Sequence, residues 1–231
     1  MRLFFEPNIG QTNLLNAEES HHAIKVLRLK NADEILVIDG NGSIYTCRIA
    51  DANQTQCKVE ILNKETQHKK PYFLELVIAP TKNMDRIEWL VEKCVEIGID
   101  SFKFIETKNS ERTKLRLDRL EKIAISAVKQ SKNYFMPSFS ELKNLDDVLN
   151  ENFDGQKFMA HCFEDNKKHL KEVIKPKSRY QILIGPEGDF TPQEIDKALS
   201  KNYVPVTFGE NRLRTETAAF FGCLAVNLAN A

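Results

Sequence analysis

The sequence predicts an α/β protein of two domains: a small β-barrel over residues 1–70 and a mostly parallel α/β domain over residues 71–231. Before position 68, apolar residues recur with the period of two that half-buried strands show. After Tyr72, short apolar runs alternate with stripes of helical period, which is typical of a parallel sheet with helices on both faces. The polar stretch 63–71, which ends in a proline, predicts the linker.

Short strands and turns predict the N-terminal β domain. Asn16 and Glu19 have the spacing of a helix N-terminus, and the Asp-Gly-Asn-Gly sequence at 39–42 is a strong hairpin signal. The strands are predicted at residues 2–6, 34–38, 45–49 and 57–61. Because each strand is short and only half of its positions are apolar, we expect a small barrel-like sheet.

In the C-terminal domain, apolar runs predict strands at residues 74–79, 102–105, 157–162, 180–184 and 204–208. The intervening helices are predicted at 84–97, 113–130, 142–149, 166–174 and 192–201. Gly98 marks the end of the first helix. A last helix over 217–229 is apolar almost all round, so we expect it to be buried in the core or against another subunit.

Composition restricts the partners of the chain. Its 231 residues carry 33 Lys and Arg against 33 Asp and Glu, so a nucleic-acid surface must be a local patch. The five scattered cysteines favour a reducing compartment without disulfides or structural zinc. His21 and His22 point apart on a helix without a third ligand nearby, so we expect no metal. No apolar stretch suits a signal peptide or a membrane span, which predicts a cytoplasmic protein.

The stretch from Gly185 to Glu194 predicts a ligand-binding loop. It follows a fully apolar strand, and Thr191, Pro192 and Glu194 together predict a capped helix directly after it. The glycines at 185 and 188 are expected to supply positive φ angles and to let another molecule approach the backbone. The first strand of the domain is followed by no glycine, which argues against a dinucleotide-binding Rossmann domain and the common glycine-rich methyltransferase fold; no P-loop is present.

A second loop, residues 208–218, predicts an anion site. Thr215 or Thr217 is expected to cap the last helix, and Glu216 complements its dipole. Helix capping does not explain the two arginines, Arg212 and Arg214, because the N-terminus of a helix disfavours cations. We therefore expect these arginines to meet a negatively charged group.

The two loops resemble those of the RsmE-type 16S rRNA (uracil-N3)-methyltransferase family, within the SPOUT class of trefoil-knot methyltransferases. The resemblance rests on Gly-Pro-Glu-Gly at 185–188 and Leu-Arg-Thr-Glu-Thr-Ala at 213–218. It extends along nearly the whole chain through His21-His22, Val26-Leu27-Arg28, Asp39-Gly40, Lys82, Lys93, Glu96, Gly98, Ser110-Glu111-Arg112 and Gln130-Ser131. It implies a PUA-like N-terminal domain, a C-terminal trefoil knot, a homodimer, S-adenosylmethionine as methyl donor and 16S rRNA of the small ribosomal subunit as substrate.

The same resemblance assigns roles to individual residues. Arg214 is expected to hold the uracil anion or an adjacent phosphate, and Glu187 and Glu216 are candidate bases, with water as an alternative. The residues expected around the methyl donor are Ala160, Ile184, Gly185, Gly188, Phe208, Gly209, Leu213 and Thr215. The residues expected to contact RNA are Arg2, His22, Arg28, Lys82, Arg86, Lys93, Arg112, Gln130 and Ser131.

Three departures from the family pattern stand out. Asp189 occupies the place of a frequent second glycine, Asn211-Arg212 replaces a more usual Arg-Ile pair, and Asn133 replaces a frequent arginine. Two alternative functions stay open from the sequence. One is a related SPOUT enzyme that methylates a ribose 2′-OH or another base, and the other is a non-catalytic RNA-binding protein of ribosome assembly.

Overall fold

The computed structural model describes residues 2–163 and 167–231, and the chain divides into two compact units. Unit 1 comprises residues 1–69 together with 125–136, and unit 2 comprises 70–124 together with 137–231. The sequence placed the division close to the same point of the chain, at residue 70, but had no signal for the return of residues 125–136 to unit 1.

Unit 1 is built on one four-stranded sheet in the order β1-β2-β3-β4. The strands are β1 (Leu3–Phe5), β2 (Glu34–Ile38), β3 (Ser43–Asp51) and β4 (Lys58–Thr66). β1 runs parallel to β2, and the other pairs are antiparallel. Short helical segments follow β1, namely α1 (Ile9–Thr12), α2 (Ala17–His21) and the π-helical turn η1 (His22–Val26). As predicted, Asn16 caps α2 by accepting a hydrogen bond from the Glu19 backbone N–H at 3.0 Å.

The predicted linker is shorter than the sequence suggested. β4 continues through Thr66, which pairs with Ser43, so residues 63–66 belong to the sheet. Polar composition was misleading here because this part of β4 is exposed, and an exposed strand needs no apolar residues.

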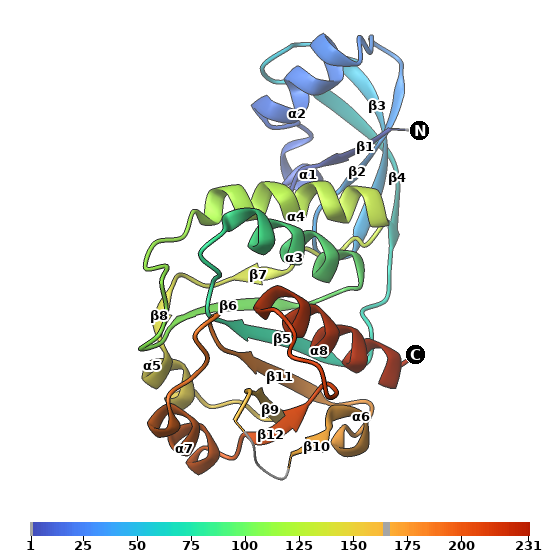
Figure 1. Cartoon of the computed structure of the whole chain (residues 1–231). Coiled ribbons are helices and arrows are strands. Elements are labelled where there is room, and N and C mark those ends of the chain that lie inside the picture. The colour runs from blue at the N-terminus through green and yellow to red at the C-terminus, as the bar shows by residue number, and fades with distance from the viewer. Residues whose placement is uncertain (1, 164–166) are drawn as a thin grey trace. The chain divides into compact units, whose positions relative to one another are not determined.

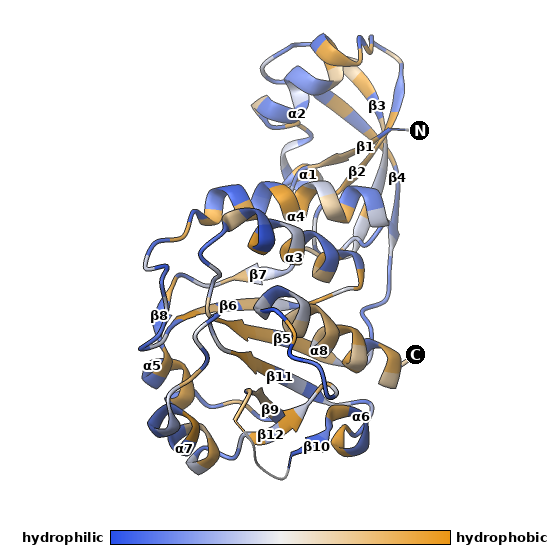
Figure 2. Ribbon diagram, in the orientation of Figure 1, coloured by the Kyte–Doolittle hydropathy of each residue, from blue (hydrophilic) through white to orange (hydrophobic). Residues whose placement is uncertain are grey.

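The sheet of unit 2 is entirely parallel in its paired strands, with the order β10-β12-β9-β11-β5-β6-β7 and with β8 beside β6. The central strands are β5 (Phe73–Ile78), β6 (Ser101–Glu106), β9 (Gln156–Ala160), β11 (Arg179–Ile184) and β12 (Val204–Thr207). The short edge strands are β7 (Ser138–Phe139), β8 (Lys143–Asn144) and β10 (Lys168–His169). Figure 2 shows how strongly apolar β5, β9 and β11 are, as strands covered on both faces must be.

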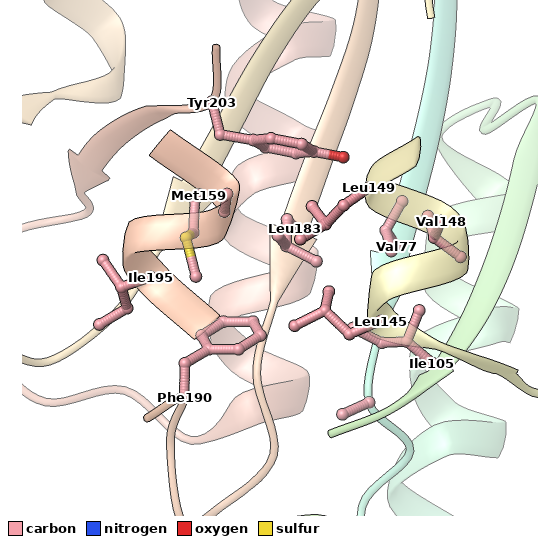
Figure 3. Packing of buried hydrophobic residues seen from close by; sticks show 12 residues of the cluster. Val77, Ile105, Leu145, Val148, Leu149, Met159, Leu183, Phe190, Ile195 and Tyr203 are labelled. Atoms are coloured by element: carbon pink, nitrogen blue, oxygen red, sulfur yellow. The ribbon is translucent and has the colours of Figure 1, made fainter. Parts of the chain in front are cut away.

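Helices cover both faces of this sheet (Figure 1). On one face, α8 (Thr215–Ala229) packs on β5 and β11 and against α3 (Met84–Glu96). On the other face, α5 (Leu145–Asn150) and α7 (Pro192–Ser200) close a core that includes Leu183 of β11 and Phe190 (Figure 3). The remaining helices are α4 (Leu117–Ser131) and α6 (Leu170–Val173).

Several helices begin at residues other than those the sequence predicted. α4 begins at Leu117 rather than at 113, and α6 begins at Leu170. The prediction for 166–174 started at residue 166, which lies outside the described residues. α8 begins at Thr215, with Arg214 in the N-cap position and no side-chain cap hydrogen bond. The expectation that Thr215 or Thr217 caps this helix was therefore wrong, because the helix starts at Thr215, two residues before the predicted start at 217.

Candidate functional site

A cavity of about 660 Å³ opens in unit 2 where β9, β11 and β12 end. These strands are parallel, so their carboxyl ends meet at the edge where open α/β sheets bind ligands. The structure brings most of the predicted donor and catalytic residues to its wall: Ala160, Ile184, Gly185, Glu187, Phe208, Gly209, Leu213, Arg214 and Thr215. Gly188 and Glu216 are not among the lining residues.

The loop after β11 has the predicted start and end but a different turn. Thr191 caps α7 in a full capping box with Glu194, which anchors the loop at its far side. Neither Gly185 nor Gly188 has a positive φ; that conformation falls on Asp189, with φ of 61°. Gly185 is instead required for packing, because a Cβ there would lie 2.8 Å from the Phe190 ring. The expected positive φ at these glycines was therefore wrong, and of the two only Gly185 lines the cavity.

This loop is hydrogen-bonded to the loops that follow β5 and β6. Glu187 Oε1 accepts a hydrogen bond from the Lys82 backbone N–H at 3.0 Å. The Asn109 amide donates to the carbonyls of Gly188 at 3.2 Å and Asp189 at 3.0 Å. Gly188 therefore lies against Asn109 rather than facing the cavity. The loops after β5 and β6 thus both hold the 185–190 segment in place.

The loop after β12 presents cations at the cavity. Arg212 and Arg214 both line it and are exposed. Gly209 has a φ of 131°, and no atom lies within 4 Å of the position a Cβ would take, so its backbone is open. Arg214 occupies the N-cap position of α8, but a guanidinium has no acceptor with which to cap a helix. Its exposed side chain lines the cavity and can donate hydrogen bonds to an anionic group there.

The two acidic candidates differ sharply in their surroundings. Glu187 is half-buried and lines the cavity. Glu216 is buried in the first turn of α8, where its Oε1 lies 3.7 Å from Nε of Arg86. Its second oxygen, Oε2, is buried without a hydrogen-bond partner among the described residues. Glu187 is thus the acid that can meet a ligand in this cavity.

One wall of the cavity was missed from the sequence. His161, Cys162, Phe163 and Lys167 line it, all from the segment after β9. The prediction extended this strand to residue 162, whereas it ends at Ala160. The apolar run gave no sign of the break, since Cys162 and Phe163 look like further strand residues.

Cys162 reports on the charges around this wall. Partial burial raises the pKa of its thiol, and the Asp189 carboxylate raises this pKa further. Arg212 and Lys167 act in the opposite direction, as positive charges favour the thiolate. An acid and two bases from three segments therefore lie close to this one sulfur.

The predicted RNA-contact residues fall into both units. In unit 1 they are Arg2, His22, Arg28, Gln130 and Ser131, of which Arg2, Arg28 and Gln130 are exposed. In unit 2, Lys82 pairs with Glu111, Lys93 pairs with Glu92 and Glu96, and Arg86 lies beside Glu216.

Arg112 is used inside unit 2. Its guanidinium donates to the carbonyls of Thr81, at 3.0 Å, and of Lys82.

The described part of the chain holds no cluster of His, Cys, Asp or Glu suited to a metal ion. Over the same residues, no helix has both the length and the apolar character needed to cross a membrane.

Both units match protein families that are named for RNA methyltransferases. Residues 68–227 match the RNA methyltransferase domain family, and residues 15–62 match the RNA methyltransferase PUA domain family. The chain is 36% identical to a probable rRNA methyltransferase of Porphyromonas gingivalis, with a TM-score of 0.91 over 100% of this chain and 98% of that one.

Two further proteins are similar over most of their length. The ribosomal RNA small subunit methyltransferase E of Neisseria gonorrhoeae, solved bound to S-adenosyl methionine, is 26% identical with a TM-score of 0.87, covering 100% of this chain and 98% of that one. The protein of the same name from Buchnera aphidicola is 26% identical over 97% of this chain and 92% of its own.

Proposed function

The chain belongs to the RNA methyltransferase family whose members carry a PUA domain, and from that premise we propose that it methylates N3 of one uridine in small-subunit (16S) ribosomal RNA. S-adenosylmethionine is the methyl donor in this proposal. The observation that carries it is the cavity where the Gly185–Asp189 loop and the Gly209–Arg214 loop meet, because the carboxylate of Glu187 and the guanidinium groups of Arg212 and Arg214 all line its wall.

The cavity suits such a donor in size and lining. About 660 Å³ lies within the usual range of small-molecule pockets, roughly 300–1,000 Å³. Ala160, Ile184 and Leu213 offer small or apolar surface for an adenine ring, and the open backbone of Gly209 offers polar atoms without a side chain. Phe208, Gly185 and Thr215 complete the residues that would hold it. When bound, S-adenosylmethionine supplies an electrophilic methyl group.

The residues on the other side of the cavity then have defined tasks. Uracil N3 carries a proton and becomes a nucleophile only when this proton leaves. Glu187 accepts it through a carboxylate oxygen, while Arg214 donates hydrogen bonds to the uracil oxygen on which negative charge develops. The donor held in the cavity would supply the methyl group to the deprotonated N3 and would keep the electron pair on its sulfur. Glu216 is the second candidate base, and its burial beside Arg86 makes it the weaker one.

We also infer that the C-terminal segment forms a trefoil knot. The order of the strands supports this: β11 lies between β5 and β9, and β12 lies beyond β9. α8 follows β12 in the chain but packs back on β5 and β11. The segment 208–214 must therefore return across the ends of β9 and β11, beside the loop that follows β11.

The proposal includes RNA contacts from unit 1 and a homodimer in the cytoplasm. The match of residues 15–62 to a PUA family, together with exposed Arg2 and Arg28, supports RNA contact by unit 1. Apolar side chains that unit 2 leaves exposed on α3 and α8 support a dimer, notably Trp89 and Leu228. Free cysteines suit a reducing compartment, and all five are free.

The decisive experiment is methyl transfer from labelled S-adenosylmethionine to small-subunit RNA, offered both free and in assembled particles. Digestion to nucleosides should yield 3-methyluridine as the labelled product. A labelled 2′-O-methyl nucleoside or another methylated base would assign the chain to a different reaction of the same class. Absence of both transfer and donor binding would favour a non-catalytic role in ribosome assembly.

A further inference from the structure

Asp189 has a left-handed backbone conformation and also carries a carboxylate, which a glycine at this position would lack. Its φ of 61° lies in the left-handed region, where most side chains are strained and Asp and Asn are better tolerated. The Asp189 backbone is held there by hydrogen bonds in which its own side chain takes no part. Its N–H donates to the Pro186 carbonyl at 2.9 Å, and its own carbonyl accepts from Asn109 at 3.0 Å. Glycine would satisfy this backbone, so the carboxylate needs a separate explanation.

Both carboxylate oxygens have backbone partners. Oδ2 accepts a hydrogen bond from the Cys162 N–H at 2.7 Å, and Oδ1 accepts one from the adjacent Phe190 N–H at 2.8 Å. The first of these bonds joins the segment after β9 to the loop after β11. Short bonds from an N–H to an ionised oxygen are stronger than neutral ones.

The two joined segments are opposite parts of one cavity wall. Cys162 and Asp189 both line it, between Ala160 and Ile184 at the strand ends and Arg212 on the loop after β12. Asp189 makes two hydrogen bonds across these segments, since its carboxylate accepts from the Cys162 backbone N–H and is also hydrogen-bonded to the Cys162 thiol. β9 and β11 are paired up to Ala160 and Ile184, and beyond these strand ends the Asp189 carboxylate links the two segments.

We propose that Asp189 is a positioning residue for the methyl donor: its carboxylate clasps the segment after β9 to the loop after β11 and so holds the cavity at the width that the donor requires. This inference rests on the proposed function, because it takes the cavity as the donor site. The donor and its demethylated product differ only at the sulfur, so a change in cavity width should affect the binding of both.

Two substitutions separate the carboxylate from the backbone. Asp189→Gly keeps the left-handed backbone and removes the clasp, whereas Asp189→Asn keeps that backbone and one acceptor oxygen. Asp196→Asn, on the exposed face of α7, is the matched control for loss of an acidic charge. Calorimetry would measure the affinity of each folded variant for S-adenosylmethionine and for S-adenosylhomocysteine, with thermal unfolding recorded alongside.

For D189G we expect about tenfold weaker binding of both ligands, the worth of one charge-assisted hydrogen bond. Its unfolding temperature should change little, because relief of the left-handed strain offsets the lost bond. D189N should bind both ligands a few-fold more weakly than the wild type but more tightly than D189G, and D196N should match the wild type. A merely structural role would lower the unfolding temperature and leave the affinity of the folded protein unchanged.

Several results would overturn the inference. Wild-type affinity in D189G would do so while leaving the proposed function intact. Failure of the wild-type protein to bind either nucleoside would remove the proposed function and this inference with it. If D189G did not fold, D189N would decide: loss of charge should weaken the clasp by a few-fold, and unchanged affinity for both ligands would refute it.

Discussion

The Glu187 carboxylate lies 3.0 Å from the backbone nitrogen of Lys82, a residue 105 positions earlier in the chain. One carboxylate oxygen therefore holds the loop after β5, while the side chain also forms part of the cavity wall. The structural role of Glu187 and the chemical role proposed for it thus fall on the same side chain. They can be separated because glutamine retains an acceptor oxygen but cannot take up a proton at neutral pH.

Glu187→Gln should lower methyl transfer by about a hundredfold or more, the usual contribution of a general base, with donor affinity retained. Glu187→Ala should lose donor affinity as well, because the hydrogen bond to Lys82 disappears. Glu216→Gln serves as the control and should leave turnover nearly unchanged, since Glu216 does not line the cavity. Near-normal turnover of E187Q, measured with labelled donor, would transfer the base role to water or to Glu216.

Arg214→Ala should reduce methyl transfer by roughly 10²–10³-fold, as removal of a donor to developing negative charge does elsewhere. The fold should be unaffected, because the side chain is exposed and makes no cap hydrogen bond. Arg116→Ala removes another exposed arginine of unit 2 and should be silent. Single-turnover rates and circular dichroism would check both points, and normal turnover of R214A would refute the assignment.

Cys162 offers a probe of the cavity. Only the thiolate reacts with iodoacetamide, and the pKa of this thiol is raised, so alkylation should be slow at pH 7 and should increase as the pH rises through this higher pKa. Asp189→Asn removes a charge that raises the pKa, so the midpoint should move to lower pH.

The buried thiols provide an internal control for this measurement. Burial raises the pKa of Cys47 and of Cys57 to about 11, so neither should react under the same conditions. S-adenosylmethionine should protect Cys162, which mass spectrometry of the modified peptide would establish. Equal alkylation with and without the donor would argue against this cavity as its site.

Leu228→Glu should convert a dimer to a monomer. Leu228 is 65% exposed on α8 within a single chain, so a charge there is tolerated by the monomer but not in an apolar interface. Val26→Glu is the matched control, because Val26 is 58% exposed in unit 1. Sedimentation should show the mass halved for L228E and unchanged for V26E. A wild-type monomer at all concentrations would contradict the dimer.

Arg2→Ala tests RNA contact by unit 1. Loss of one phosphate contact should weaken RNA binding at every sequence and reduce the slope of log affinity against log salt by about 0.7–0.9. Arg112→Ala differs in its expected result, since Arg112 donates to the carbonyls of Thr81 and Lys82. Removal of the Arg112 side chain should lower the unfolding temperature. For R2A, a salt slope equal to that of the wild type would exclude Arg2 from the RNA surface.

Much of the fold was predictable because it depends on local periodicity. The apolar runs of β5 and β11, the stripe of α3 and the capping box at Thr191 all appear in the structure close to where the sequence predicted them. The family resemblance then indicated which loops form the cavity. Strand ends were mispredicted where hydrophobicity does not follow the strand. β4 extends into a polar segment, and β9 ends before the apolar residues that follow it.

The sequence by itself determined the longer strands and helices and the two loops, because each depends on residues close together in the chain, whereas the two-residue strands β7, β8 and β10 gave no local signal. Only the tertiary structure decided which loop residues act together. Glu187 meets Lys82, Asp189 meets Cys162, and Asn109 meets Gly188 across separations that leave no periodic signal. The left-handed backbone falls on Asp189 rather than on its glycine neighbours because packing of Phe190 and bonds from other loops select the turn. These contacts exist only when the strands have assembled into the sheet, so no single stretch of the sequence predicts them.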